Sequence, residues 1–392
     1  MTLPADLNHG EVIVVRLQRP LYGEKDAGKQ FELKVDEIAK LAGYEKSIYA
    51  PSTYFRYEGD KFSYMVVYVD DILICTNDDE WYDTTMAAFR ANVLEIVETP
   101  NLSTYLGINI NTVKDKNGKF YFKLDQVDYI NNISGDVGNI GYNYKVQETP
   151  MISNYEASKA MAVDEDMKYN IQSIVGSLRF AAERTRPDIQ AVLGIISQKV
   201  VDVSEYQVHH SQRILQYLQS NPIEMAYYHE SEYELICLVD AAYLTNEHSC
   251  SRGGYIMFYG MRSSPIAYKS WKIKEVCTST MHAELIPVVK AIQAIIYQIN
   301  LLKELRLPVQ IPVNIYTDSQ ALIDTIDSKV ILKGSRHFLF RINYIKQMIG
   351  TGIITLKKIP GEQNVADLFT KPEDKTTHLK NAKAIFQGLQ SI

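Results

Sequence analysis

Two adjacent carboxylates interrupt an apolar segment at residues 63–75, which read SYMVVYVDDILIC. The β-branched and aromatic residues on both sides predict strands at 63–69 and 72–75. Leaving a carboxylate unpaired inside a core costs several kcal/mol. The chain is therefore expected either to turn at Asp70 and Asp71 or to give their charges to a cation.

Mixed helix and strand patterns follow this segment. Residues 80–96 have helical spacing, and residues 105–111 and 118–124 flank the turn-forming sequence DKNG, which predicts a β-hairpin. Three helical patterns then occupy residues 169–220. A mainly helical middle section is thus predicted between two β-containing ends.

Residues 221–234 (NPIEMAYYHESEYE) combine a proline with clustered acids and are the best candidate for a linker. After it, three strand-like segments precede a long helix, and then come a strand, two helices, a strand and a final helical turn. The long helix repeats apolar residues three and four positions apart, which predicts one buried face; these residues are Leu285, Val288, Val289, Ile292, Ile295, Ile296, Ile299 and Leu302. This order of elements predicts an α/β layer structure of about 140 residues, an ordinary domain size.

Composition limits the class of protein. With 392 residues, 46% of them hydrophobic, the chain is long enough for two or three folded domains. Its net charge of −6 means that a nucleic-acid partner would have to be held by local basic patches. The cysteines have no C-x-x-C spacing, which argues against a zinc ribbon and favours a reducing compartment; they are Cys75, Cys237, Cys250 and Cys277. Neither a signal peptide nor an apolar run of about 18 residues is recognised, so a soluble intracellular protein is expected.

Four acids fall at element ends in the C-terminal region. Asp240 and Asp318 each end a predicted strand, Glu284 lies in the first turns of the long helix, and Asp367 follows a possible helix cap at Asn364. Neighbouring strands lie about 4.8 Å apart, so such acids can converge. Like charges that close repel by roughly 4 kcal/mol, which favours a bound divalent cation. Oxygen ligands indicate Mg²⁺ or Mn²⁺, and two such ions can catalyse phosphodiester hydrolysis. Each acid taken alone is more often a turn or cap residue.

Residues 235–372 resemble the ribonuclease H domain of copia-type LTR-retrotransposon Pol polyproteins. LVDAAYLTNEHSCSRGGYIMFYG is similar to the family's S-D-A-x-x-A…S-x-x-G-Y segment, TSTMHAEL to S-S-x-x-E-A-E-Y, YTDSQAL to D-N-x-S-A and NVADLFTKP to L-A-D-x-x-T-K-P. The resemblance implies that the four acids Asp240, Glu284, Asp318 and Asp367 are catalytic metal ligands for two Mg²⁺ or Mn²⁺ ions. SRHFLFRINYI is similar to the family's T-K-H-I-D-x-R-x-H-x-I block and implies substrate contact by His337, although a helix-start role fits equally well.

The N-terminal part resembles the reverse transcriptase of the same family. YVDDILI is similar to its Y-V-D-D-[LM] palm hairpin, in which Asp70 and Asp71 would be catalytic metal ligands and Tyr68 would lie beside the primer end. RPLYGEKDAGKQF, with Lys25 as a nucleic-acid contact, is similar to L-Y-G-L-K-Q-A-x-x-x-W/F. YLGINI and IVGSLRFAAERTRPDI are similar to F-L-G-I-E-I and V-G-x-L-x-Y-L-x-x-T-R-P-D-I. A surface turn with an incidental pair of aspartates is the alternative for the hairpin.

The resemblance implies an organisation for nearly the whole chain. Residues 1–112 would be a partial reverse-transcriptase palm, 113–230 a mainly helical thumb and connection, 231–372 a ribonuclease H-like mixed-sheet domain and 373–392 a C-terminal tail. The fold class is therefore α/β (α+β). Implied partners are RNA–DNA hybrid, template-primer and the remainder of the Pol polyprotein, without a membrane, in cytoplasmic virus-like particles and the nucleus.

Some features depart from the family pattern. The family's D-V-x-x-A-F-L block, which carries a further catalytic aspartate, has no counterpart, so an N-terminally truncated chain without polymerase activity of its own is expected. Glu24 and Asp26 replace a leucine and a glutamine of the family, which should weaken phosphate binding. Pro287 lies inside the long helix, where a proline costs about 3 kcal/mol of stability. Either the helix is kinked there, or this copy of the element has drifted in sequence.

Basic residues near the predicted nuclease acids are candidate phosphate contacts. They are Lys269, Lys272 and Lys274 around Trp271, and Lys333, Arg336 and Arg341 near His337. A solvated face is the commoner explanation for such residues. Ribonuclease H activity is the favoured function, and a catalytically inert relic or a co-opted nucleic-acid-binding module remains the alternative.

Overall fold

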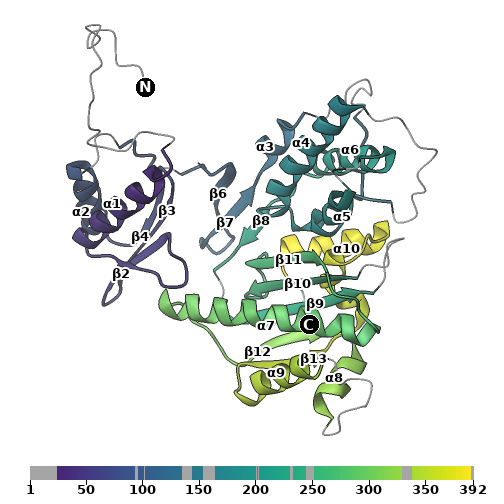
Figure 1. The fold of residues 1–392 in the computed structure, drawn as a ribbon. Coiled ribbons are helices and arrows are strands. Elements are labelled where there is room, and N and C mark those ends of the chain that lie inside the picture. The colour runs from purple at the N-terminus through teal and green to yellow at the C-terminus, as the bar shows by residue number, and fades with distance from the viewer. Residues whose placement is uncertain are drawn as a thin grey trace, which may run out of the picture. The chain divides into compact units, whose positions relative to one another are not determined.

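The computed structural model describes residues 24–92, 96–100, 102–134, 144–152, 164–199, 201, 203–229, 233–243, 251–328 and 338–389. The chain divides into two compact units, Met1–Thr99 and Pro100–Ile392 (Figure 1). Both combine helices with sheets, which confirms the predicted α/β class.

The first unit packs two helices against a four-stranded antiparallel sheet. Its elements are α1 (Ala27–Leu41), β1 (Glu45–Lys46), β2 (Thr53–Glu58), β3 (Lys61–Tyr68), β4 (Asp71–Thr76) and α2 (Asp79–Asn92), with strand order β1-β2-β3-β4. Val35 and Ile38 of α1, Met65 of β3 and Phe89 of α2 form its buried core. The chain turns between β3 and β4, so the first of the two expected outcomes for the Asp70–Asp71 pair holds.

A small antiparallel sheet begins the second unit. It contains β5 (Thr104–Tyr105), β6 (Ile108–Lys114), β7 (Phe120–Asp125) and β8 (Met225–Tyr227), in the order β5-β6-β7-β8. Strands β6 and β7 form the predicted hairpin. Strand β8 corrects the linker interpretation of residues 221–234, because Met225 pairs with Leu124 and is buried. Strand pairing with β7 therefore determines the structure of this segment more than its proline and acidic residues do.

The helical middle section is confirmed. Its elements are α3 (Val127–Asn131), α4 (Glu165–Ala182), the short 3₁₀-helix η2 (Pro187–Ile189), α5 (Gln190–Ile196), η3 (Ser197–Lys199) and α6 (Glu205–Ser220). The side chain of Asp164 accepts a hydrogen bond from the backbone N–H of Met167 and caps α4. Ser204 and Gln207 form a capping box at the start of α6.

A five-stranded mixed sheet organises the C-terminal part of the second unit. Its strands are β9 (Leu235–Ala242), β10 (Arg252–Tyr259), β11 (Ala267–Lys272), β12 (Val313–Thr317) and β13 (Ile354–Lys358), in the order β11-β10-β9-β12-β13. The pairs β11–β10 and β10–β9 are antiparallel, whereas β9–β12 and β12–β13 are parallel. The predicted series of strands and helices is therefore present. The order of the strands in the sheet differs from their order along the chain.

Helices cover both faces of this sheet (Figure 1). One core joins it to α7 (Thr280–Glu304), α8 (Gln320–Asp327) and α9 (Leu339–Gly350). On the other face, η5 (Gly361–Gln363) precedes η6 (Val365–Phe369), which forms the second core together with α10 (Lys375–Gln387). Residues 373–392, predicted only as a tail, thus contribute Ile385 and Phe386 to that core.

Helix α7 has the length and mean hydropathy of a membrane span, although polar residues interrupt its apolar sequence. Half of its most apolar window is buried, and its predicted apolar face packs on the sheet and on α9. These contacts are those of a core helix. The helix continues from Thr280 to Glu304 through the buried Pro287.

Candidate functional site

Three aspartates from different elements meet at one end of the five-stranded sheet. Asp240 and Asp318 converge because β9 and β12 run parallel, with Leu238 opposite Tyr316, so each aspartate follows two residues later. Asn364 precedes η6 and donates its side-chain amide to the carbonyl of Val239 at 3.0 Å, which brings Asp367 to the same place. One carboxylate oxygen from each aspartate lies within 4.8 Å of the others.

Glu284 completes this acid cluster from the second turn of α7. Its side chain is buried, and among the described residues its Oε2 atom has no hydrogen-bond partner. Burial raises the pKa of Glu284 to about 9, and the charges of Asp240, Asp318 and Asp367 add to this shift. The structure therefore brings three of the four predicted acids within reach of one ion, and Glu284 is near enough for their charges to act on it.

A bound cation would relieve the electrostatic repulsion in the acid cluster. Burial, followed by the charge of Asp367, raises the pKa of Asp240 to about 6. Burial and the charge of Asp240 also raise the pKa of Asp318. The Oδ1 atom of Asp367 and the Oε2 atom of Glu284 lack hydrogen-bond partners among the described residues, so ligand atoms are available. An all-oxygen donor set of this kind fits Mg²⁺ or Mn²⁺.

Two residues that contact the acids, Lys371 and Thr370, were not predicted from the sequence. The Nζ atom of Lys371 lies 2.7 Å from Oδ2 of Asp367 in an ion pair. The hydroxyl of Thr370 donates a hydrogen bond to Oδ2 of Asp240. Both residues belong to the matched NVADLFTKP block, so the signal was present, although only its aspartate was assigned a role.

The hairpin between β3 and β4 in the first unit carries the other predicted acids, Asp70 and Asp71. Tyr68 pairs with Asp71, and Val69 and Asp70 form the turn. Tyr68 and both aspartates are exposed. Val69 has φ +52°, a conformation that a β-branched residue rarely adopts. Strained backbone of this kind is concentrated at functional sites.

The predicted nucleic-acid contacts have different surroundings. Lys25 is exposed in the turn before α1, and Lys272 is exposed at the end of β11. Arg336 and His337, like Lys333, lie outside the described residues. Arg341 donates from Nη2 to both carboxylate oxygens of Glu275, at 2.7 and 2.9 Å, so its charge is already paired.

A buried ion pair lies in the matched segment RTRPDI. The guanidinium of Arg186 donates to both carboxylate oxygens of Asp188, at 3.0 and 2.8 Å. Tyr217 of α6 donates to the same carboxylate at 2.7 Å, and its hydroxyl lies 2.9 Å from Nε2 of His378 in α10. This network ties the helical section to the C-terminal helix, a role that the sequence alone did not reveal.

The chain is similar in sequence to a family of reverse transcriptases and to transposon polyproteins. Residues 4–153 match the reverse transcriptase (RNA-dependent DNA polymerase) family. The chain is 27% identical over 370 residues to the retrovirus-related Pol polyprotein from transposon TNT 1-94 of Nicotiana tabacum, which covers 92% of this chain and 27% of that protein. It is 26% identical over 374 residues to the corresponding polyprotein from transposon RE1 of Arabidopsis thaliana, covering 95% of this chain and 25% of that protein. The chain thus spans about a quarter of the length of these relatives.

Solved ribonuclease H structures are among the proteins similar to this chain. LC11-RNase H1, isolated from compost, has a TM-score of 0.28 and 17% sequence identity, over 36% of this chain and 94% of that chain. The N-terminal RNase H domain of rv2228c from Mycobacterium tuberculosis has a TM-score of 0.27 and 13% identity, over 39% of this chain and 99% of that chain.

Proposed function

This chain is a relative of the Pol polyproteins of copia-type retrotransposons, and from that premise we propose that its second unit hydrolyses the RNA strand of RNA–DNA hybrids. The observation that carries the proposal is the meeting of Asp240, Asp318 and Asp367 within 4.8 Å, beside the buried Glu284. These residues are far apart along the chain. A cluster of four acids is unfavourable by itself, so its presence favours a cation-dependent function.

The side chains around the cluster have distinct roles in this proposal. Asp240, Asp318 and Asp367 would hold divalent ions, and Glu284 would hold one ion and orient the attacking water. Lys371 offsets part of the negative charge through its ion pair with Asp367. The hydrogen bond from Thr370 fixes the carboxylate of Asp240. Mg²⁺ or Mn²⁺, when bound, would supply Lewis-acid activation of water and charge stabilisation at the scissile phosphate.

Water attack on the scissile phosphate would break the bond to the 3′ oxygen and leave 3′-hydroxyl and 5′-phosphate ends. The attacking water releases a proton to solvent, and the departing 3′ oxygen takes up a proton from solvent as the bond breaks. The net charge of the chain is −6, so substrate binding must depend on local basic residues, and the affinity should fall steeply with salt.

DNA synthesis by this chain alone is not part of the proposal. Asp70 and Asp71 supply two carboxylates at the hairpin of the first unit, whereas the family's palm uses a further aspartate from the D-V-x-x-A-F-L block. Two acids are insufficient for the shared two-metal site. Mg²⁺-dependent primer extension by the purified chain would contradict this expectation.

The nuclease proposal is tested with a labelled RNA–DNA hybrid and Mg²⁺. Asp318→Asn should reduce cleavage by at least about 100-fold, since removal of one well-placed electrostatic group costs this much in other enzymes. Asp327→Asn is the matched control, because Asp327 is an exposed aspartate at the end of α8, and its activity should be unchanged. Hybrid binding without Mg²⁺-dependent cleavage would support a binding module and overturn the enzyme proposal.

A further inference from the structure

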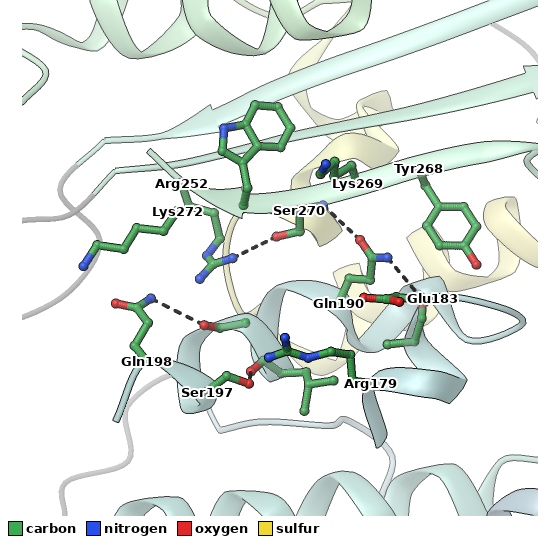
Figure 2. Close-up of a pocket in the computed structure, with 14 residues that line it drawn as sticks. Arg179, Glu183, Gln190, Ser197, Gln198, Arg252, Tyr268, Lys269, Ser270 and Lys272 are labelled. Atoms are coloured by element: carbon green, nitrogen blue, oxygen red, sulfur yellow. Dashed lines mark hydrogen bonds between the residues drawn. The ribbon is translucent and has the colours of Figure 1, made fainter. Parts of the chain in front are cut away.

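A cavity of about 500 Å³ lies beside β11, the edge strand of the five-stranded sheet (Figure 2). Helices α4 and α5 form its other wall, and Gln190 of α5 accepts a hydrogen bond from the backbone N–H of Ser270 at 2.9 Å. All of these elements belong to the second unit. The cavity is therefore built by the helical section and the sheet together, and its volume is that of a small-ligand site.

Positive charge is concentrated in this cavity. Its lining includes four basic residues and one acid, Glu183; the basic residues are Arg179, Arg252, Lys269 and Lys272. The whole chain has the opposite net charge, −6. The lining also offers neutral hydrogen-bonding groups from Ser197 and Gln198. Such a set of groups is suited to an anion rather than to an apolar ligand.

Arg252 is held in place by the walls of the cavity. Its side chain is only 4% exposed, and its Nη1 atom donates to the hydroxyl of Ser270 at 3.0 Å. The guanidinium packs on Gly194 of α5, where an added Cβ would lie 2.6 Å from Nη1. Figure 2 shows Arg252 reaching down from the sheet and Arg179 lying on the helical side. Both guanidinium-bearing side chains thus line the same cavity, one from each wall.

The cavity is close to the acid cluster on the same face of the sheet. Asp240 lies opposite Gly254, and Gly254 lies opposite Ser270, so the three residues form one row across β9, β10 and β11. Two strand spacings separate Asp240 from Ser270, which is about 10 Å. Ser270 also donates to the carbonyl of Phe369 at 2.5 Å, and the next residue, Thr370, bonds Asp240.

We propose that this cavity binds a backbone phosphate of the nucleic-acid strand that passes the acid cluster. The inference rests on the proposed function and adds a second anchor for the same substrate. The row from Asp240 to Ser270 spans about 10 Å of sheet, so the cavity and the acid cluster would contact different phosphates of the same strand. Arg179, Arg252 and Lys272 are the groups that would contact it.

The test measures binding of a fluorescent RNA–DNA hybrid to the full chain in EDTA, so cleavage is not required. Arg179→Glu and Lys272→Glu should each raise the Kd about tenfold and reduce the slope of log K against log salt by about 1. Lys383→Glu, a charge reversal at an exposed lysine of α10, is the matched control and should change the Kd less than twofold. Thermal unfolding of each variant checks that the fold is retained.

Titration with AMP and inorganic phosphate distinguishes a strand from a free anion. The proposal is overturned if Arg179→Glu and Lys272→Glu bind hybrid like the unaltered chain, or if Lys383→Glu is equally impaired. It is also overturned if Arg179→Glu abolishes AMP or phosphate binding while hybrid affinity is unchanged, because the cavity is then a small-anion site. If Arg179→Glu and Lys272→Glu lose hybrid affinity and the unaltered chain never cleaves the hybrid, the nuclease proposal is refuted. Phosphate binding by the cavity is then still supported.

Discussion

Replacement of Arg186 by methionine tests whether the buried network holds the second unit together. Arg186 is 1% exposed and donates from Nε and Nη2 to Asp188, and from Nη1 to the carbonyl of Asn221 at 2.9 Å. Methionine would leave the equally buried Asp188 with the Tyr217 hydroxyl as its remaining hydrogen-bond donor among the described residues. An uncompensated buried charge costs about 3–5 kcal/mol. A domain is typically stable by about 5–15 kcal/mol, so the loss would be a large fraction of the total.

Urea unfolding followed by circular dichroism measures this loss. Arg184→Met is the matched control, since Arg184 lies two residues away with an exposed side chain, and it should change the free energy of unfolding by less than about 0.5 kcal/mol. The double variant Arg186→Met with Asp188→Leu should recover much of the loss, because no charge then remains buried. A loss below about 1 kcal/mol for Arg186→Met, or a double variant as unstable as the sum of both single variants, would refute the reasoning.

Three further outcomes are expected. Gly254→Ala should destabilise the second unit by about 1–3 kcal/mol and reduce hybrid cleavage, since its Cβ would lie 2.4 Å from Cβ of Phe369 and displace η6; unaltered unfolding would contradict this. Burial lowers the pKa of His210 to about 4, so the unfolded chain binds the extra proton and stability is lost as the pH falls from about 6.5 to 4; Tm measurements should show a shallower decline for His210→Phe. Lys371→Met removes the cation paired with Asp367, so Tm without metal should fall and the Tm increase on adding Mg²⁺ should grow; an equal increase in both chains would count against a metal at this site.

Local patterns were sufficient to predict most elements and the identity of the four acids. The apolar repeat of α7 and the β-branched segment around Asp70 follow from spacings of 3.6 and 2 residues, which depend only on the neighbouring sequence. The motif around NVADLFTKP likewise placed Asp367 just after its cap, Asn364, whose side chain accepts a hydrogen bond from the N–H of Ala366. The predicted final helical turn is present as a 3₁₀-helix, Val365–Phe369.

Only the tertiary structure decided which distant groups meet. The pairing of β8 with β7 turned part of an apparent linker into a strand, because a pairing partner about 100 residues away satisfied its backbone groups. The order β11-β10-β9-β12-β13 placed Asp240 beside Asp318, and packing of α5 on the sheet placed Gly194 beside Arg252. Sequence determines the preferences of short segments, whereas strand order, and with it the acid cluster, the cationic cavity and the Arg186 network, depends on long-range packing that no local pattern encodes.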